Sequence, residues 1–195
     1  VGNGWMTTES VFLKDKALHF QLNDGEFRPR ASRMFTKLEG GSFKVSFSLD
    51  WLRKDEGTWG FYMQLGNNAE MPKSLIYERD LAKGVGVNLA WGGRDAIGGE
   101  EPGSFGYFKD MKFHNLFMAN DLSAKNTLVD NPVVTLEVDL DAGTYAVGFN
   151  GKTYPNIPLE NEGPIDTIRF VTTGCSKTGF LKSSIDDLIV LEGKK

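Results

Sequence analysis

Three arginines lie close together in the segment EFRPRASRMF, residues 26–35. Side chains alternate along an extended chain, so Arg28 and Arg30 are expected to point to one side of it, with Arg33 close by. Guanidinium groups bind carboxylates and sulfates through paired hydrogen bonds. The segment therefore predicts contact with an acidic ligand, such as a polymer that carries uronic acids or sulfates. The alternative is a solvated strand face whose arginines pair with nearby acids.

Uncharged polar residues interrupt two apolar segments further along the chain. Tyr62 and Gln64 alternate with the apolar residues of TWGFYMQLG, and Asn88 does the same in GVGVNLAW. Phenol and amide groups in the middle of a strand can bond sugar hydroxyls, so these residues predict a polar groove. The alternative is that they are exposed to solvent or pair with one another between strands.

Two aromatic residues are candidates for the rim of that groove. Trp91 lies at the end of a predicted strand, before GGRDAIGG, and Tyr107 lies in FGYFKDMKF. Aromatic faces at the edge of a polar site can stack on sugar rings. Most tryptophans are core residues, and Trp59 fits the buried side of its segment. The two histidines have no zinc-binding spacing, which argues against a catalytic zinc site.

The elements that must position these side chains read as short strands. In TLEVDLDAGTYAVGFNGKTYPNIPL, residues 135–159, apolar and polar residues alternate with period two, and DAG and NG mark turns. The same alternation occurs in ALHFQL, SFKVSFSLDW, IDTIRFVTT and SSIDDLIVLEG. Helical periodicity is scarce, and SLIYERDLAK, residues 74–83, fits a short helix or a strand. Many short strands with glycine-rich turns predict an all-β sandwich of two antiparallel sheets.

The totals restrict the class of protein. A chain of 195 residues without an interdomain linker predicts one domain over residues 1–195, and 40% of the residues are hydrophobic. The net charge of −4 is spread along the chain, which argues against nucleic acid as a partner. No apolar run approaches the roughly 18–20 residues that span a bilayer, so membrane insertion is not expected.

The opening residues VGNGWMTTES contain no initiator methionine, basic start or apolar stretch. They fit a mature secreted protein or an excised module. Cys175 is the only cysteine, which excludes an internal disulfide and is compatible with a protein exported by a bacterium. We therefore expect an extracellular bacterial protein, either monomeric or a module of a larger polypeptide.

The order of the segments resembles that of a known family. GW, RASRMF, GGSFKVSFSLDW and GFYMQLG are followed by VTLEVDLDAGTYAVGFNGK and the closing IDTIRFVTTG and SIDDLIVLEG. This order is similar to that of the concanavalin A-like, laminin-G-like jelly rolls of bacterial carbohydrate-active proteins. The resemblance implies a groove on the concave sheet that binds a polysaccharide or oligosaccharide. It also implies one structural calcium ion near the closing strand, with Asp186 and Asp187 as ligands.

Members of this superfamily include non-catalytic carbohydrate-binding modules and polysaccharide lyases. RPRASR and YMQLG resemble the arginine- and glutamine-bearing strands of alginate-lyase-like folds. However, Gln64 is followed by Leu65, where such lyases usually carry an apolar residue and a histidine, and Phe180 lies where a catalytic tyrosine is expected. We therefore expect a binding module without catalytic residues. The alternatives are a lyase that cleaves uronate polymers by β-elimination and a laminin-G-like module that binds proteins.

Overall fold

The computed structural model describes residues 4–8, 10–22, 29–53, 59–71, 85–92, 104–110, 112–117, 133–149, 151–174 and 181–192. All regular secondary structure in these ranges is β-strand. Within them, no helix is long and apolar enough to cross a membrane.

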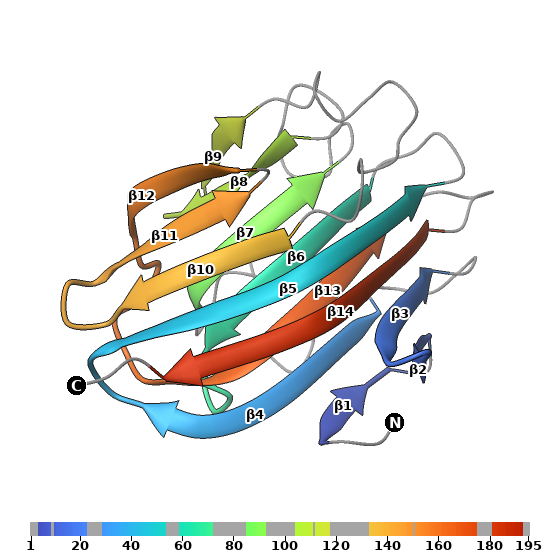
Figure 1. Ribbon diagram of the computed structural model, residues 1–195, viewed down its shortest axis with the longest axis horizontal. Coiled ribbons are helices and arrows are strands. Elements are labelled where there is room, and N and C mark those ends of the chain that lie inside the picture. The colour runs from blue at the N-terminus through green and yellow to red at the C-terminus, as the bar shows by residue number, and fades with distance from the viewer. Residues whose placement is uncertain are drawn as a thin grey trace.

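The described strands form two seven-stranded sheets whose paired strands are antiparallel (Figure 1). Sheet A contains, in spatial order, β1 (Trp5–Thr7), β4 (Arg30–Leu38), β13 (Ile165–Gly174), β6 (Trp59–Gly66), β7 (Val85–Gly92), β8 (Ser104–Lys109) and β9 (Lys112–Phe117). Sheet B contains β12 (Lys152–Pro158), β11 (Thr144–Phe149), β10 (Val133–Asp139), β5 (Ser42–Arg53), β14 (Leu181–Glu192), β3 (Ala17–Leu22) and β2 (Val11–Lys14).

The two sheets pack face to face around one apolar core. Phe47 of sheet B meets Phe170 of sheet A edge to face, with ring centroids 5.2 Å apart. Phe105 of sheet A stacks on Phe149 of sheet B with centroids 4.6 Å apart. Each side chain of this size stabilises the fold by roughly 1.5–3 kcal/mol when it leaves water. The predicted antiparallel β-sandwich is therefore confirmed.

The meander has the predicted arrangement. Strands β10 and β11 pair with each other, β11 pairs with β12, and the burial along β10 alternates strictly. Gly143 and Gly151 follow the turn signals of the sequence and take φ values of 65° and 73°, which glycine adopts without strain. Strand β10 also pairs with β5, so the meander forms one flank of sheet B.

Strands β8 and β9 were not expected from the sequence. Their hairpin contains a register shift between Phe105 and Gly106, which interrupts the simple alternation that reveals a strand. Gly106 lies so close to the carbonyl oxygen of His114 that a side chain has no room there. The segment 74–83 lies outside the described residues, so the choice between helix and strand stays open there.

Candidate functional site

Polar side chains line up across four neighbouring strands of sheet A. Ser32 of β4 pairs with Arg169 of β13, Arg169 pairs with Gln64 of β6, and Gln64 pairs with Asn88 of β7. Directly paired residues of an antiparallel sheet point to the same face. Their chain neighbours Ile168 and Leu65 belong to the core, so this polar row lies on the outer face of sheet A.

Hydrogen bonds connect the three inner members of the row. The Nε and Nη2 atoms of Arg169 both donate to Oε1 of Gln64, at 2.9 and 2.7 Å. Nε2 of Gln64 donates to Oδ1 of Asn88 at 3.1 Å. All three side chains are buried; even the long Arg169 is only 3% exposed. Gln64 and Asn88 thus point away from the core, as predicted. They are buried and bonded to each other, so the alternative of an inter-strand polar pair holds and they do not line an open groove.

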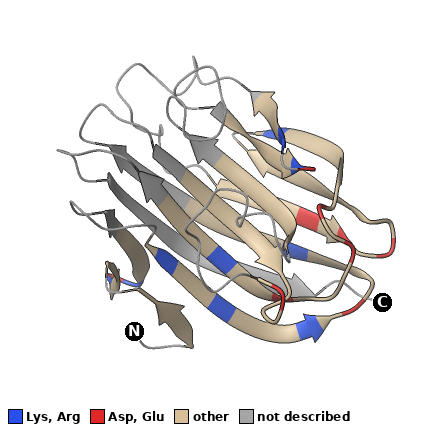
Figure 2. Ribbon diagram, turned by 180° about the vertical axis from the view of Figure 1, so that it is seen from behind, with Lys and Arg blue, Asp and Glu red and all other residues tan. Residues whose placement is uncertain are grey.

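A second guanidinium lies beside this network on the same face. Arg30 pairs with Val171, two residues along β13 from Arg169. Burial, and to a lesser extent the charge of Arg30, lower the pKa of Arg169 to about 10. Figure 2, seen from the side of sheet A, shows basic positions on both strands. The surroundings of Arg169 therefore disfavour its positive charge on balance.

The neighbouring row on this face is apolar. Tyr62 pairs with Val171 and Ala90, and these three residues form a small buried cluster against Phe108 and Phe113. The ring centroids of Tyr62 and Phe108 are 6.1 Å apart. Tyr62 is therefore on the predicted side of its strand, but it is packed among hydrophobic side chains and is only 1% exposed.

One accessible part of the described face lies at the β1–β4 edge. Arg30 and Ser32 are partly exposed, and Met34, the next residue on that side of β4, is 50% exposed. Met6 of β1 pairs with Ser32 and is 52% exposed. A guanidinium, a hydroxyl and two thioethers thus form an open strip, which we call the β4 strip.

The other predicted binding residues lie elsewhere or outside the described part. Arg33 pairs with Ile168, so it points to the opposite face of β4 from Arg30 and is exposed. Tyr107 stacks on His114 with centroids 4.9 Å apart and packs against the main core. Arg28 lies outside the described residues, and so does the side chain of Trp91, whose backbone pairs with Phe61 and Phe105.

The predicted calcium ligands lie on the closing strand. Asp186 pairs with Ser48 of β5, and the register shifts between Asp186 and Ile189, so Asp187 lies within an irregularity of the ladder. Their side chains fall outside the described part. Among the described side chains, no three His, Cys, Asp or Glu residues come together as a metal site. The calcium ion stays a prediction.

Arg169 and Ser32 are the members of the row that the sequence did not predict, and Arg169 is the charged one. The sequence of its segment, IDTIRFVTT, predicts a closing strand and no ligand contact. The signal was one cation at the centre of an apolar strand, where an unpaired charge is costly and calls for hydrogen-bonding partners. The hydrogen-bonding partner of Arg169 is Gln64 of β6, which lies 105 residues earlier in the sequence.

Comparisons with known proteins extend the description of the fold. No protein-family model matches the chain, and no curated protein matches it in sequence. Among solved structures, a sialidase superposes with a TM-score of 0.66 and 15% identity over 98% of this chain, which spans 17% of the sialidase chain.

Two smaller proteins align over most of their own length. The carbohydrate recognition domain of Emp47p matches with a TM-score of 0.61 and 12% identity, over all of this chain and 90% of that one. The alginate lyase AlyC3, in complex with dimannuronate, matches with a TM-score of 0.56 and 12% identity, over 96% of this chain and 80% of that one. The chain has the jelly-roll fold of concanavalin A-like lectin and polysaccharide-lyase domains.

Proposed function

We propose that the chain is a non-catalytic carbohydrate-binding protein that holds an acidic saccharide against the outer face of sheet A. One observation carries the proposal: two guanidinium groups and two amides from four adjacent strands gather on one face, with Arg30 at the accessible side. Guanidinium groups match the geometry of carboxylates and sulfates.

The electrostatics of the pair favour an acidic ligand. Arg30 and Arg169 are like charges on neighbouring strands, and Arg30 helps to lower the pKa of Arg169. A carboxylate or sulfate bound to Arg30 would offset this repulsion, since an opposite charge nearby stabilises a cation. Binding of an anion is therefore expected to raise the free energy of unfolding of the chain.

The β4 strip also offers an apolar contact for the ligand. Met34, two residues beyond Ser32 on β4, and Met6, the partner of Ser32 on β1, both expose thioether side chains. Sugar rings present C–H groups on one face and hydroxyls at their edge, so they suit a strip that combines apolar and polar groups. In this arrangement Arg30 binds the acidic group, Ser32 bonds a hydroxyl, and the methionines contact the ring.

The solved structures of similar fold support a saccharide ligand. One of them is a carbohydrate recognition domain, and another is an alginate lyase in complex with dimannuronate, which is an acidic saccharide. A lyase needs a base that reaches a sugar proton. On the described outer face Tyr62 is packed among hydrophobic side chains, and the amides of Gln64 and Asn88 have no basic group to offer. These observations favour binding over β-elimination.

Affinity electrophoresis in gels that contain alginate, an acidic polymer, tests the proposal. Arg30→Ala removes the proposed contact, and Arg33→Ala is a matched control because it removes the same charge from the opposite face of the same strand. We expect alginate to retard the wild type and the Arg33 variant, and retardation to fall at least tenfold for the Arg30 variant. An equal loss of retardation in both variants would show that alginate responds to the net charge of the chain alone, and it would refute the proposed site.

Two further outcomes identify the rival functions. Release of an unsaturated uronate from alginate, followed by its ultraviolet absorbance, would establish lyase activity and overturn the non-catalytic reading. No retardation by alginate, pectin or a sulfated galactan would refute saccharide binding at this face and favour a protein partner.

A further inference from the structure

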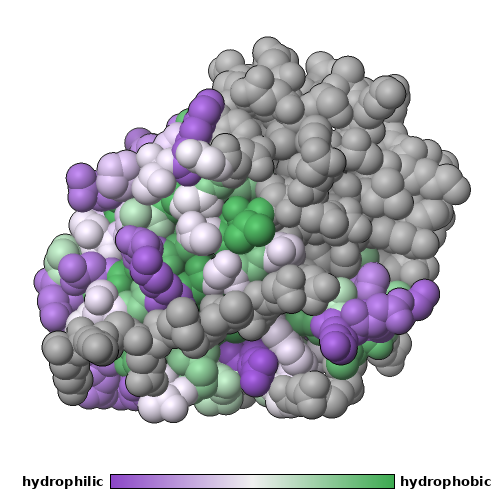
Figure 3. Space-filling model, in the orientation of Figure 1, coloured by the Kyte–Doolittle hydropathy of each residue, from purple (hydrophilic) through white to green (hydrophobic). Residues whose placement is uncertain are grey.

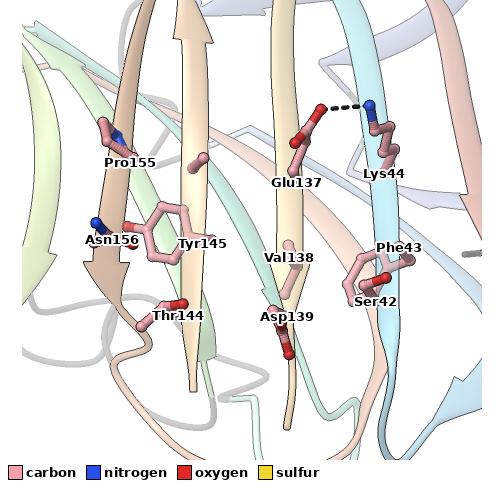
Figure 4. A pocket seen from close by; sticks show the side chains of 11 residues that line it. Ser42, Phe43, Lys44, Glu137, Val138, Asp139, Thr144, Tyr145, Pro155 and Asn156 are labelled. Atoms are coloured by element: carbon pink, nitrogen blue, oxygen red, sulfur yellow. Dashed lines mark ion pairs between the residues drawn. The ribbon is translucent and has the colours of Figure 1, made fainter. Parts of the chain in front are cut away.

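The outer face of sheet B contains a hollow of about 470 Å³. This volume falls within the range of small-molecule sites, roughly 300–1,000 Å³. It is lined by residues of β5, β10, β11 and β12, including Lys44, Glu137, Asp139, Ala146, Pro155 and Asn156 (Figure 4). The hollow lies on the sheet opposite the polar row, so it is a separate surface.

The hollow results from small side chains beside a bend in the edge strand. The outward residues of β11 include Ala146 and Gly148, which alternate with buried residues of the core. The pairing of β11 with β12 shifts register between Tyr145 and Val147, so Ala146 lies at the irregularity. Asn156 on β12 has a φ of 57°, which asparagine tolerates better than most residues. The depression is thus built into the backbone.

Charged side chains form one wall of the hollow. Glu137 and Lys44 are directly paired across β10 and β5 and form an ion pair, drawn as a dashed line in Figure 4. Both remain more than half exposed, at 61% and 63% of their side chains. The nearby Asp139 accepts a hydrogen bond from the backbone N–H of Ala142 through Oδ1, at 2.9 Å. Two carboxylates therefore line the hollow beside one ammonium, and one of the two is paired with that ammonium.

The opposite wall and the floor supply other kinds of contact. Pro155 and Asn156 of β12 offer an apolar ring and an amide, and Ala146 offers a methyl group. Figure 3 shows hydrophilic and hydrophobic side chains interleaved over the described part of this face. Carboxylate and amide oxygens accept hydrogen bonds from hydroxyl groups, and small apolar groups suit the C–H face of a sugar ring.

We propose that this hollow is a second saccharide site, specific for a neutral sugar unit. Its excess of carboxylates repels an acidic ligand, whereas the guanidinium pair on sheet A attracts one. The chain then holds two saccharides of different charge on opposite faces of the sandwich. A protein of this kind can bridge an acidic and a neutral polysaccharide.

A titration of the whole chain, followed by two-dimensional NMR of backbone amides, tests the second site. The probes are cellotriose, laminaritriose and mannotriose, each added at millimolar concentration. At least one is expected to shift the amides of Glu137, Ala146 and Asn156 in a saturable manner. If none of the three shifts these amides, the proposed site is refuted.

Two variants show whether such binding occurs in the hollow. Ala146→Phe fills the floor from the solvent side and is expected to weaken binding at least tenfold. Asn156→Gly removes the amide while glycine keeps the positive φ, so it preserves the fold and is expected to weaken binding several-fold. Unchanged affinity in a folded Asn156→Gly variant overturns the assignment. Arg30→Ala is expected to leave neutral binding unchanged, so failure here is distinguishable from failure of the site on sheet A.

Discussion

The guanidinium of Arg169 donates through two of its nitrogens to a single acceptor, Oε1 of Gln64, and both side chains are buried in the outer face of sheet A. Because the acceptor is a neutral amide, this contact orients the guanidinium without neutralising its positive charge. Gln64 also donates to Asn88, which fixes which end of the amide faces Arg169. Hydrogen bonds therefore link Arg169, Gln64 and Asn88 into one buried unit, and Arg30 lies beside this unit at the accessible edge of the sheet.

Gln64→Leu is expected to destabilise the fold by about 2–4 kcal/mol, because it removes the acceptor from a buried cation and the donor from Asn88. Gln64→Glu is the informative partner, since a carboxylate can still accept from Arg169. It is expected to recover much of the loss at neutral pH. Urea unfolding of the three proteins measures both effects, and a leucine variant as stable as the wild type would mean that the network contributes nothing to stability.

Sequence patterns predicted the sandwich well because alternation records which face of each strand is buried. The side of the strand was correct for Gln64 and Asn88, and the turns predicted at DAG and NG are present, with positive φ at Gly143 and Gly151. The burial of residues on the outer face of sheet A was not predictable in this way, because alternation shows only which side of a strand faces the core between the two sheets. Polar residues opposite a core are read as solvent-facing, yet Tyr62 belongs to a second apolar cluster.

The composition of the site was less predictable than the fold. The arginines of 26–35 were read as one group, but strand geometry places Arg30 and Arg33 on opposite faces. The charged neighbour of Arg30 on its own face is Arg169, which lies far away in sequence and is adjacent only because β13 inserts between β4 and β6. Such adjacency depends on strand order, which a single sequence does not encode locally.

Thr172→Val is expected to stabilise the chain by about 1 kcal/mol. The hydroxyl of Thr172 is fully buried on the core side of β13 and finds no hydrogen-bond partner in the described part of the chain. Valine keeps the shape and removes the unsatisfied group. Thr167→Val is the matched control on the same strand, because the Thr167 hydroxyl donates to Oδ1 of Asp166 at 2.8 Å. It is expected to destabilise by a similar amount, and thermal melts that show the same sign for both variants would contradict this account.

Alkaline pH is expected to destabilise the chain in part through Tyr145. Burial, with smaller contributions from Tyr107 and Glu160, raises the pKa of Tyr145 well above its usual value of 10.0. In the unfolded chain this hydroxyl ionises near pH 10, so above that pH the unfolded state binds fewer protons and stability falls. The contribution reaches about 1.4 kcal/mol per pH unit.

Tyr145→Phe isolates this contribution, because all other tyrosines are shared by both proteins. The free energy of unfolding of the variant relative to the wild type should be constant below about pH 9 and rise in favour of the variant toward about pH 11. Urea titrations across this range measure the difference. A difference that does not change with pH would show that Tyr145 ionises equally in both states.

Gly106→Ala is expected to disrupt the β8–β9 hairpin. A β-carbon at Gly106 would overlap the carbonyl oxygen of His114 and come within 2.7 Å of the Phe113 ring, and the first of these is backbone that cannot move aside cheaply. Gly151→Ala is the contrasting control, since its β-carbon meets open space and the cost arises only from φ at 73°. That cost is about 1 kcal/mol, whereas the Gly106 variant should lose several times more. Urea unfolding of the two variants measures the difference, and equal losses of stability would contradict this account of the hairpin.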